Sequence, residues 1–180
     1  ADYFVQKDNF ELAKIMIREL FNKELIFHSH NSAAIERASD VGDEYVRAGM
    51  AQFGYSGFDE SLGLKKVLKL YANRVSSRVL KAGQSVGYGG VFTAKYDMDI
   101  ATYDLGYGDG LFRYNGKGEL NLANGKPILG KMSMDSFSSI DMGERICVID
   151  DANIWAEFFD TINYDVLVKL SPLINRRVVE

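Results

Sequence analysis

Two tyrosines stand in glycine-rich stretches, Tyr88 in the sequence GYGG and Tyr107 in the sequence GYGDG. The ordinary pKa of tyrosine is about 10, so a phenol accepts a proton only where its surroundings stabilise the phenolate. Glycine within a β segment weakens it, and often marks a bend, a bulge or a place where a ligand or another backbone comes very close. The two tyrosines are therefore candidate acid–base residues, although aromatic packing in a β-domain explains such short stretches as well.

Ser32 and Arg47 are candidates for binding a ligand. The pair Asn31-Ser32 opens an expected short helix, where a hydroxyl beside free backbone N–H groups suits a phosphate. A serine that only caps the helix gives the same pattern and is the more common case. Arg47 stands near the end of an expected strand, where α/β folds place ligand contacts, and Gly49 lets backbone N–H groups approach a ligand. A surface arginine fits that position equally.

Two further groups are weaker candidates. His28 and His30 lie on the same side of an expected strand, which is how a metal site could begin, but no third ligand stands nearby, and we predict no bound metal. Met134 and Asp135 follow the entry of a strand, where the methionine fits a core or edge position and the aspartate an exposed turn.

The elements that must position these residues change character along the chain. Up to about residue 59 helical and strand patterns alternate, which is typical of a parallel α/β arrangement. We expect a helix over 8–22 with Asp8 as its N-cap, a buried strand over 25–28, a short helix after Asn31 and a further short apolar strand over 50–54.

After Gly63 the pattern becomes that of short strands, starting with 67–75. Glycine-containing turns are expected at 81–83, 115–118, 124–127 and 142–144. One helix, at about 152–159, interrupts the strands. The sequence thus predicts an α/β part followed by an all-β part, the second a small barrel or sandwich.

Composition limits the classes of function. The chain has 180 residues, of which 47% are apolar, so it can bury a core. Its net charge is −4 and it has no block of Lys or Arg, which argues against nucleic acid as a partner. The lone Cys147 cannot form an intramolecular disulfide. Without a signal-peptide pattern or an apolar run of spanning length, we expect a cytoplasmic protein that does not enter the membrane.

Taken together, the motifs occur in an order that resembles the C-terminal half of bacterial alanine racemase. The resemblance covers nearly the whole chain. It is carried by HSHNSAA (28–34), VRAG (46–49), SVGYG (85–89), GYGDGLFR (106–113), PILGKMSMD (127–135) and TINYD (161–165). Each motif alone is weak, whereas six of them in one order are specific.

The resemblance implies a fold and a cofactor. Members of the family have an N-terminal eight-stranded α/β barrel followed by a β-domain, bind pyridoxal 5′-phosphate and interconvert L- and D-alanine for peptidoglycan. Residues 1–62 would be the last part of the barrel and residues 63–180 the β-domain. By the resemblance, Ser32 binds the cofactor phosphate with backbone N–H groups of Gly49 and Met50, and Arg47 faces the pyridine nitrogen.

The resemblance also implies the residues that meet the substrate. Tyr88 matches the tyrosine base that exchanges the α-proton on one face of alanine, while the cofactor lysine serves the other face. Tyr107 matches a tyrosine at the substrate entrance, and Met134 lies where the backbone meets the substrate carboxylate, next to Asp135. In the family this site is shared between the subunits of a homodimer.

Some features depart from the family pattern. The lysine that carries the cofactor lies upstream of Ala1 in the family, so we expect an incomplete chain that is inactive by itself. Ser171-Pro172 occupies a segment where some members have a further tyrosine on the phosphate, and no role is assigned there. Two alternatives stay open: a related decarboxylase that uses the same cofactor, and a non-catalytic β-domain that serves subunit association.

Overall fold

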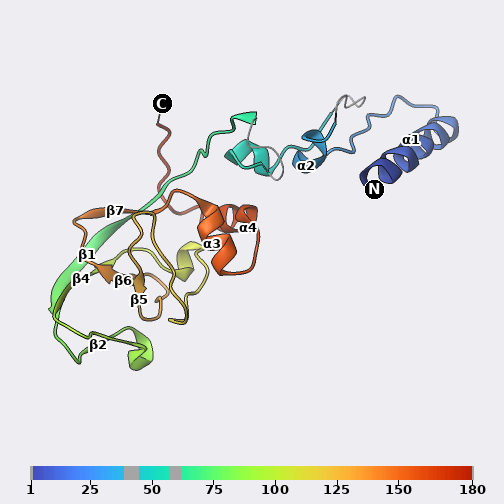
Figure 1. The fold of residues 1–180 in the computed structure, drawn as a ribbon. Coiled ribbons are helices and arrows are strands. Elements are labelled where there is room, and N and C mark those ends of the chain that lie inside the picture. The colour runs from blue at the N-terminus through green and yellow to red at the C-terminus, as the bar shows by residue number, and fades with distance from the viewer. Residues whose placement is uncertain (1, 39–44, 57–61, 180) are drawn as a thin grey trace. The chain divides into compact units, whose positions relative to one another are not determined.

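The chain divides into two compact units, Ala1–Val67 and Leu68–Glu180, in a computed structural model that describes residues 2–38, 45–56 and 62–179 (Figure 1). We call them the first unit and the second unit. The sequence predicts the boundary between the α/β part and the β-rich part between residues 62 and 63, and the structure divides the chain between residues 67 and 68.

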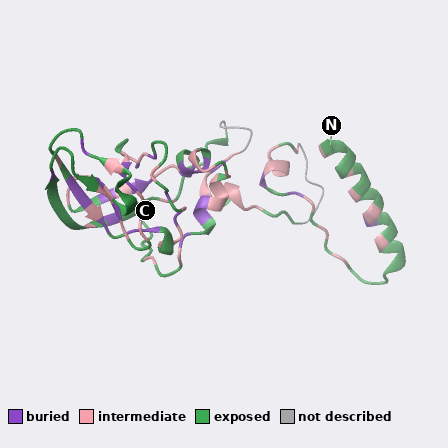
Figure 2. Ribbon diagram, turned by 90° about the horizontal axis from the view of Figure 1, so that it is seen from below, coloured by how far each residue is buried: buried purple, intermediate pink, exposed green. Residues whose placement is uncertain are grey.

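The first unit begins with the helix α1, Asp2–Leu20. The prediction of a helix over 8–22 was right about its existence and wrong about its start, because nothing between Asp2 and Asp8 breaks a helix and Asp8 lies inside it rather than at its N-cap. Most of α1 is exposed, and its buried residue is Lys14 (Figure 2). Lys14 donates to Glu11 at 3.0 Å.

In the described part of the first unit, α1 is followed by the helix α2, Ser32–Ile35, and the 3-10 helix η1, Met50–Phe53. The expected short helix after Asn31 is confirmed. The expected strand over 50–54 is wrong, since η1 occupies it. No strand forms over 25–28 either, because a strand requires a paired neighbour, and in the described part of this unit the β pairing is a single parallel bridge between Asn31 and Arg47.

The second unit is built on a five-stranded antiparallel sheet in the order β5-β6-β4-β1-β7 (Figure 1). A separate hairpin pairs β2 with β3. The strands are β1 Leu70–Leu80, β2 Ser85–Val86, β3 Phe92–Thr93, β4 Met98–Tyr103, β5 Ile128–Leu129, β6 Phe137–Ile140 and β7 Arg145–Ile149. The β-rich second unit is confirmed, and it consists of a curled antiparallel sheet.

The long strand β1 organises this sheet. Its first part pairs with β7, from Leu70 to Asn73, and its second part pairs with β4, from Arg74 to Leu80. The register is irregular between Leu70 and Tyr71 in the pairing with β7, and between Arg74 and Ser76 in the pairing with β4, and such irregularities let the strand bend. Leu80, Ile100 and Leu129, from β1, β4 and β5, are almost fully buried and form one apolar cluster. Burial of this cluster drives the sheet to curl around it.

The helices α3, Ala152–Phe158, and α4, Asn163–Val168, pack against each other beside the sheet (Figure 1). The sequence predicted α3 but not α4. Trp155 of α3 is 1% exposed, and the ring of Phe159 stacks on Phe112 with 5.0 Å between centroids. The segment after Tyr107 is therefore anchored on α3 by aromatic contacts.

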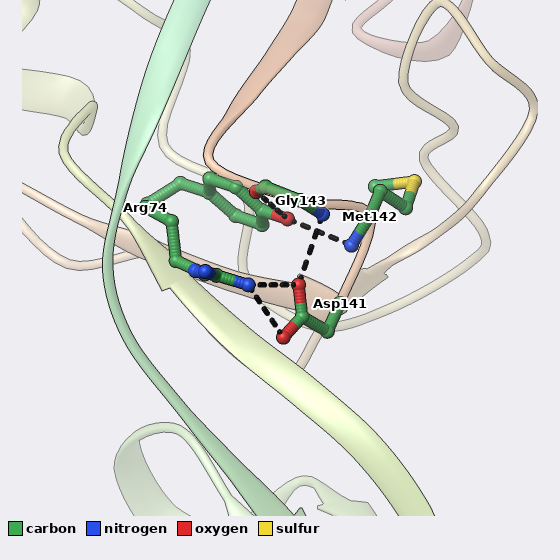
Figure 3. Close-up of polar contacts among 5 residues, drawn as sticks. Arg74, Asp141, Met142 and Gly143 are labelled. Atoms are coloured by element: carbon green, nitrogen blue, oxygen red, sulfur yellow. Dashed lines mark hydrogen bonds and ion pairs between the residues drawn. The ribbon is translucent and has the colours of Figure 1, made fainter.

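An ion pair ties the sheet together at the turn between β6 and β7 (Figure 3). Arg74 of β1 donates from Nη1 to both carboxylate oxygens of Asp141, at 3.0 Å each, and Asp141 also accepts from the backbone N–H of Gly143 at 3.0 Å. The hydrogen bond from Gly143, and then Arg74, hold the pKa of Asp141 below its ordinary value. The buried Tyr103 hydroxyl accepts from the Met142 N–H at 3.1 Å.

Candidate functional site

Ser32 is the first residue of α2, is 6% exposed, and collects backbone donors from a distant segment. Its Oγ accepts from the N–H of Gly49 at 3.0 Å and from the N–H of Ala51 at 3.4 Å. The N-cap of α2 is Asn31, whose side chain accepts from the Ala34 N–H at 3.0 Å. Capping is therefore not the role of Ser32, and its hydroxyl oxygen instead accepts from two amides, which are groups that bind anions in proteins.

The amide of Ala51 is one that the sequence analysis missed, since Gly49 and Met50 were expected. In η1 the backbone turns so that the N–H of residue 51, two positions after Gly49, reaches Ser32. This contact arises because residues 50–53 form a 3-10 turn and not the expected strand. A prediction of the turn would have indicated that the Ala51 N–H reaches Ser32.

Arg47 lies on the segment that pairs with the start of α2. Its backbone N–H donates to the carbonyl of His30 at 2.8 Å, and its guanidinium Nη2 donates to the carbonyl of Ser29 at 3.1 Å. The side chain is exposed. The parallel bridge between Asn31 and Arg47 thus brings Ser32, Gly49 and Arg47, far apart in sequence, to neighbouring places in the first unit.

The two histidines have different surroundings. His30 is 3% exposed, and its ring nitrogens meet the hydroxyls of Tyr3 at 3.1 Å and of Ser29 at 2.8 Å. His28 lines a cavity of about 300 Å³ together with Tyr3 and Arg47. Within residues 2–38, 45–56 and 62–179 no group of three or more His, Cys, Asp or Glu side chains is placed to hold a metal ion.

Tyr88 opens the 3-10 turn η3, Tyr88–Gly90, at the tip of the hairpin between β2 and β3, and is 66% exposed. The glycines around it mark a close approach of two backbones. Gly87 has φ 81°, and a Cβ there would lie 2.8 Å from the nitrogen of Lys131. A Cβ on Gly130 would lie 2.5 Å from the carbonyl oxygen of Val86. The hairpin that carries Tyr88 therefore rests directly on residues 130–131.

Tyr107 opens a second 3-10 turn, η4, Tyr107–Asp109, just after β4. The N–H of Tyr107 donates to the carbonyl of Ser133 at 3.2 Å, and the N–H of Gly108 donates to the carbonyl of Met134 at 2.7 Å. A Cβ on Gly106 would overlap the same Met134 carbonyl. The turn and residues 133–134 are thus in backbone contact, and glycine is required there for lack of room.

Residues 130–135 are consequently the support for both tyrosines. Tyr88 is held at one end of this segment, and Tyr107 is held at the other. Met134 projects its side chain into solvent and is 59% exposed, while Asp135 accepts from the Ser133 and Ser136 hydroxyls at 3.3 and 3.2 Å. The second unit therefore brings Tyr88, Tyr107, Met134 and Asp135 to one segment. The motifs indicated these residues individually, and nothing in the sequence indicated that one backbone segment links them.

The surroundings of Tyr107 include a cation that the sequence analysis did not single out. The guanidinium carbon of Arg113 lies 5.4 Å from the centre of the Tyr107 ring. A cation over an aromatic face is attracted by its quadrupole. The spacing of Tyr107 and Arg113 along the chain gave no indication of this contact, because it depends on how the chain turns back after Gly110.

None of the helices in the described part of the chain combines the length and the apolarity needed to cross a membrane.

Comparisons with known proteins agree on one family. The family model "Alanine racemase, C-terminal domain" matches residues 67–178. Alanine racemase of Campylobacter concisus (strain 13826) is 66% identical over 183 residues, which cover 99% of this chain and 54% of the relative. Alanine racemase of Campylobacter curvus (strain 525.92) is 64% identical with the same coverage. The chain spans about half the length of the curated relatives it matches.

Solved structures give the same result. Alanine racemase of Clostridium difficile 630 in complex with cycloserine superposes with a TM-score of 0.82 at 26% identity, over 98% of this chain and 53% of that structure. Alanine racemase of Bartonella henselae with covalently bound pyridoxal phosphate superposes with a TM-score of 0.76 at 27% identity, over 96% of this chain and 52% of that structure.

Proposed function

Since the chain belongs to the alanine racemase family, we propose that it is the C-terminal half of a pyridoxal 5′-phosphate-dependent enzyme that interconverts L- and D-alanine. The observation that carries the proposal is the arrangement of Tyr88, Tyr107 and Met134 on residues 130–135. A base for one face, an entrance residue and a backbone contact for a carboxylate are the parts that this unit would contribute to racemisation of a small amino acid.

The two units then correspond to the two parts of a racemase. The first unit, Ala1–Val67, forms the last part of an α/β barrel, and the second unit, Leu68–Glu180, forms the β-domain. The parallel direction of the bridge between Asn31 and Arg47 supports the first assignment, since the strands of such a barrel are parallel. The antiparallel sheet supports the second.

The cofactor phosphate is held by the first unit. Ser32 Oγ, Gly49 N–H and Ala51 N–H meet at one point, and Met50 lies between the last two. In the structure the serine oxygen itself accepts from both amides, so a phosphate oxygen would have to take over these two donors from Ser32 Oγ, and the serine hydroxyl would then donate to the phosphate as a third. When bound, pyridoxal phosphate withdraws electrons from the α-carbon of the amino acid and so makes its proton acidic.

Arg47 tunes that withdrawal. One guanidinium nitrogen donates to the Ser29 carbonyl, which fixes the plane of the group, and the other N–H groups of the fork suit the cofactor's ring nitrogen. A fixed positive charge disfavours protonation of that nitrogen. Electron withdrawal is therefore moderate, and return of the proton to the α-carbon competes well with side reactions.

Tyr88 exchanges the α-proton on one face of the substrate. As a phenolate its Oη accepts the proton from one enantiomer, and as a phenol it returns a proton to form that enantiomer from the other. The opposite face needs a second base, which we assign to a lysine that this chain does not contain. Because Tyr88 stands exposed at the tip of a hairpin, it can enter the barrel of a second subunit, which makes the enzyme a homodimer with shared sites.

Tyr107, Met134 and Asp135 bind and admit the substrate. We assign binding of the alanine carboxylate to the N–H of Met134, whose carbonyl accepts from the Gly108 N–H at 2.7 Å. Tyr107 lines the entrance, and Asp135 fixes the turn through Ser133 and Ser136. The product would serve peptidoglycan synthesis in the cytoplasm.

The proposal is tested with the full-length enzyme, that is, this chain together with its upstream half. It should convert L-alanine to D-alanine, followed with a D-amino-acid oxidase assay, and should do so only with bound pyridoxal phosphate. The 180-residue chain alone, treated with cofactor and borohydride, should give no stoichiometric adduct on a single lysine. Release of CO₂ from an amino acid in place of racemisation would favour the decarboxylase, and neither reaction would favour an association domain.

A further inference from the structure

Asp109 closes the turn that carries Tyr107. Its Oδ2 accepts from the backbone N–H of Gly106 at 2.9 Å, and its own N–H donates back to the carbonyl of Gly106 at 3.1 Å. The side chain is partly buried. These two reciprocal hydrogen bonds fix both ends of a four-residue loop, so the direction of Tyr107, one of the two residues between them, depends on the carboxylate.

The same turn is held from two sides. On one side lie Ser133 and Met134, which accept from the N–H groups of Tyr107 and Gly108. On the other side the N–H of Ser171 donates to the carbonyl of Asp109 at 2.8 Å, and a Cβ on Gly110 would overlap the carbonyl of Lys169. The turn therefore stands between the end of α4 and residues 133–134, and it transmits a small displacement rather than absorbing it.

We infer that Asp109 is a positioning residue for the reaction of this site: its carboxylate sets the place of the Tyr107 ring and, through Gly108, of the Met134 peptide. The inference rests on the proposed function. Asp109 would then control how a small substrate is bound without contacting the substrate itself, because it acts through Tyr107 and Met134. Loss of this acceptor leaves the Gly106 N–H without its partner and frees the turn to shift.

Variants of the full-length enzyme test the inference. Asp109→Ala should raise the KM for alanine about tenfold or more, with a smaller fall in kcat and an unchanged cofactor content, because misplaced binding groups cost up to about a hundredfold. Asp109→Asn keeps an oxygen that accepts from Gly106 and should stay within about threefold of the native KM. Asp151→Ala is the matched control, since Asp151 caps α3 by accepting from the Asn153 N–H at 3.0 Å in the same unit. It should lower the melting temperature and leave KM unchanged.

A double-mutant cycle separates positioning from general loss of stability. In a Tyr107→Ala background, Asp109→Ala should raise KM by a much smaller factor than in the native enzyme, because part of its effect passes through the missing ring. Equal factors in both backgrounds would overturn the inference. An Asp109→Ala enzyme with native KM and only a lower melting temperature, like Asp151→Ala, would do so too.

A replacement variant covers failure to fold, and the outcome for activity separates this inference from the proposed function. If Asp109→Ala does not fold, Asp109→Glu replaces it, because the carboxylate is then kept but displaced by one methylene, and a native KM in that variant contradicts the inference. A native full-length enzyme without racemase activity refutes the proposed function. A racemase whose KM is insensitive to Asp109 refutes this inference alone.

Discussion

The support of Tyr88 by residues 130–131 is tested most sharply at Gly130. This residue is buried at φ 72°, and a Cβ there would lie 2.5 Å from the Val86 carbonyl oxygen and 3.2 Å from the Cα of Gly87. Gly125 provides a matched control, since its φ is 76° and a Cβ there would meet nothing within 4 Å. Alanine at either position bears the same conformational strain, and only alanine at 130 also collides with the Tyr88 hairpin.

The expected magnitudes follow from these two contributions. Positive φ costs a non-glycine residue about 1–2 kcal/mol. Overlap with a packed backbone adds about 1–3 kcal/mol, because the neighbours have to move. Gly125→Ala should therefore lower the free energy of unfolding by about 1–2 kcal/mol, and Gly130→Ala by about 2–5 kcal/mol.

Trp155 makes the measurement specific to the second unit, because it is buried in α3 and the chain has one tryptophan. Urea unfolding followed by its fluorescence gives both free energies. In the full-length enzyme, Gly130→Ala should also slow racemisation about tenfold or more through displacement of Tyr88, while Gly125→Ala stays near native. Equal losses of stability in the two variants, with equal activity, would refute the idea that this close approach positions Tyr88.

Three other predictions concern the cofactor site and the sheet. Ser32→Ala should weaken binding of pyridoxal phosphate by about tenfold or more, measured by fluorescence titration, because one donor to an anion is lost. Arg47→Glu should slow racemisation and let transamination appear in a product assay, since the ring nitrogen then gains a proton; unchanged products would remove Arg47 from the cofactor site. The lowered pKa of Asp141 gives stability that is present above its unfolded pKa of about 4 and is lost as pH falls through its folded pKa. Asp141→Asn should therefore flatten the acid side of the profile of unfolding free energy against pH, and a native profile would contradict this.

The turns of the second unit were predictable from the sequence because their signal is local. Gly83, Gly116, Gly125 and Gly143 all adopt positive φ at expected turns. The helix α4 was missed because Asn163–Val168 is short and rich in residues with low helix propensity. It is stabilised by packing on α3 and by the Thr161 hydroxyl, which donates to Asp165 at 3.0 Å. Such support is not visible in a local window of sequence.

In the candidate site, too, local features were predictable from the sequence and contacts between distant segments were not. The residues Ser32, Arg47, Tyr88 and Tyr107 could be chosen from their motifs, and glycine beside the tyrosines indicated a close approach. Which backbone approaches was not predictable, because residues 130–134 lie more than twenty positions from either turn and are brought there by pairing of β5 with β6. The strand expected over 25–28 failed for a related reason: parallel pairing depends on neighbours far along the chain.

The role of Tyr88 as the base on one face is tested by exchange of the α-hydrogen in deuterated water, measured from each enantiomer of alanine separately, with Tyr88→Phe in the full-length enzyme. Tyr96→Phe is the control, because Tyr96 is 68% exposed, close to the 66% of Tyr88, and has no assigned role. We expect Tyr88→Phe to slow exchange from one enantiomer by about a hundredfold or more, and to leave exchange from the other enantiomer and the cofactor content nearly native. Equal slowing from both enantiomers, or none, would contradict the role of Tyr88 as the base on one face.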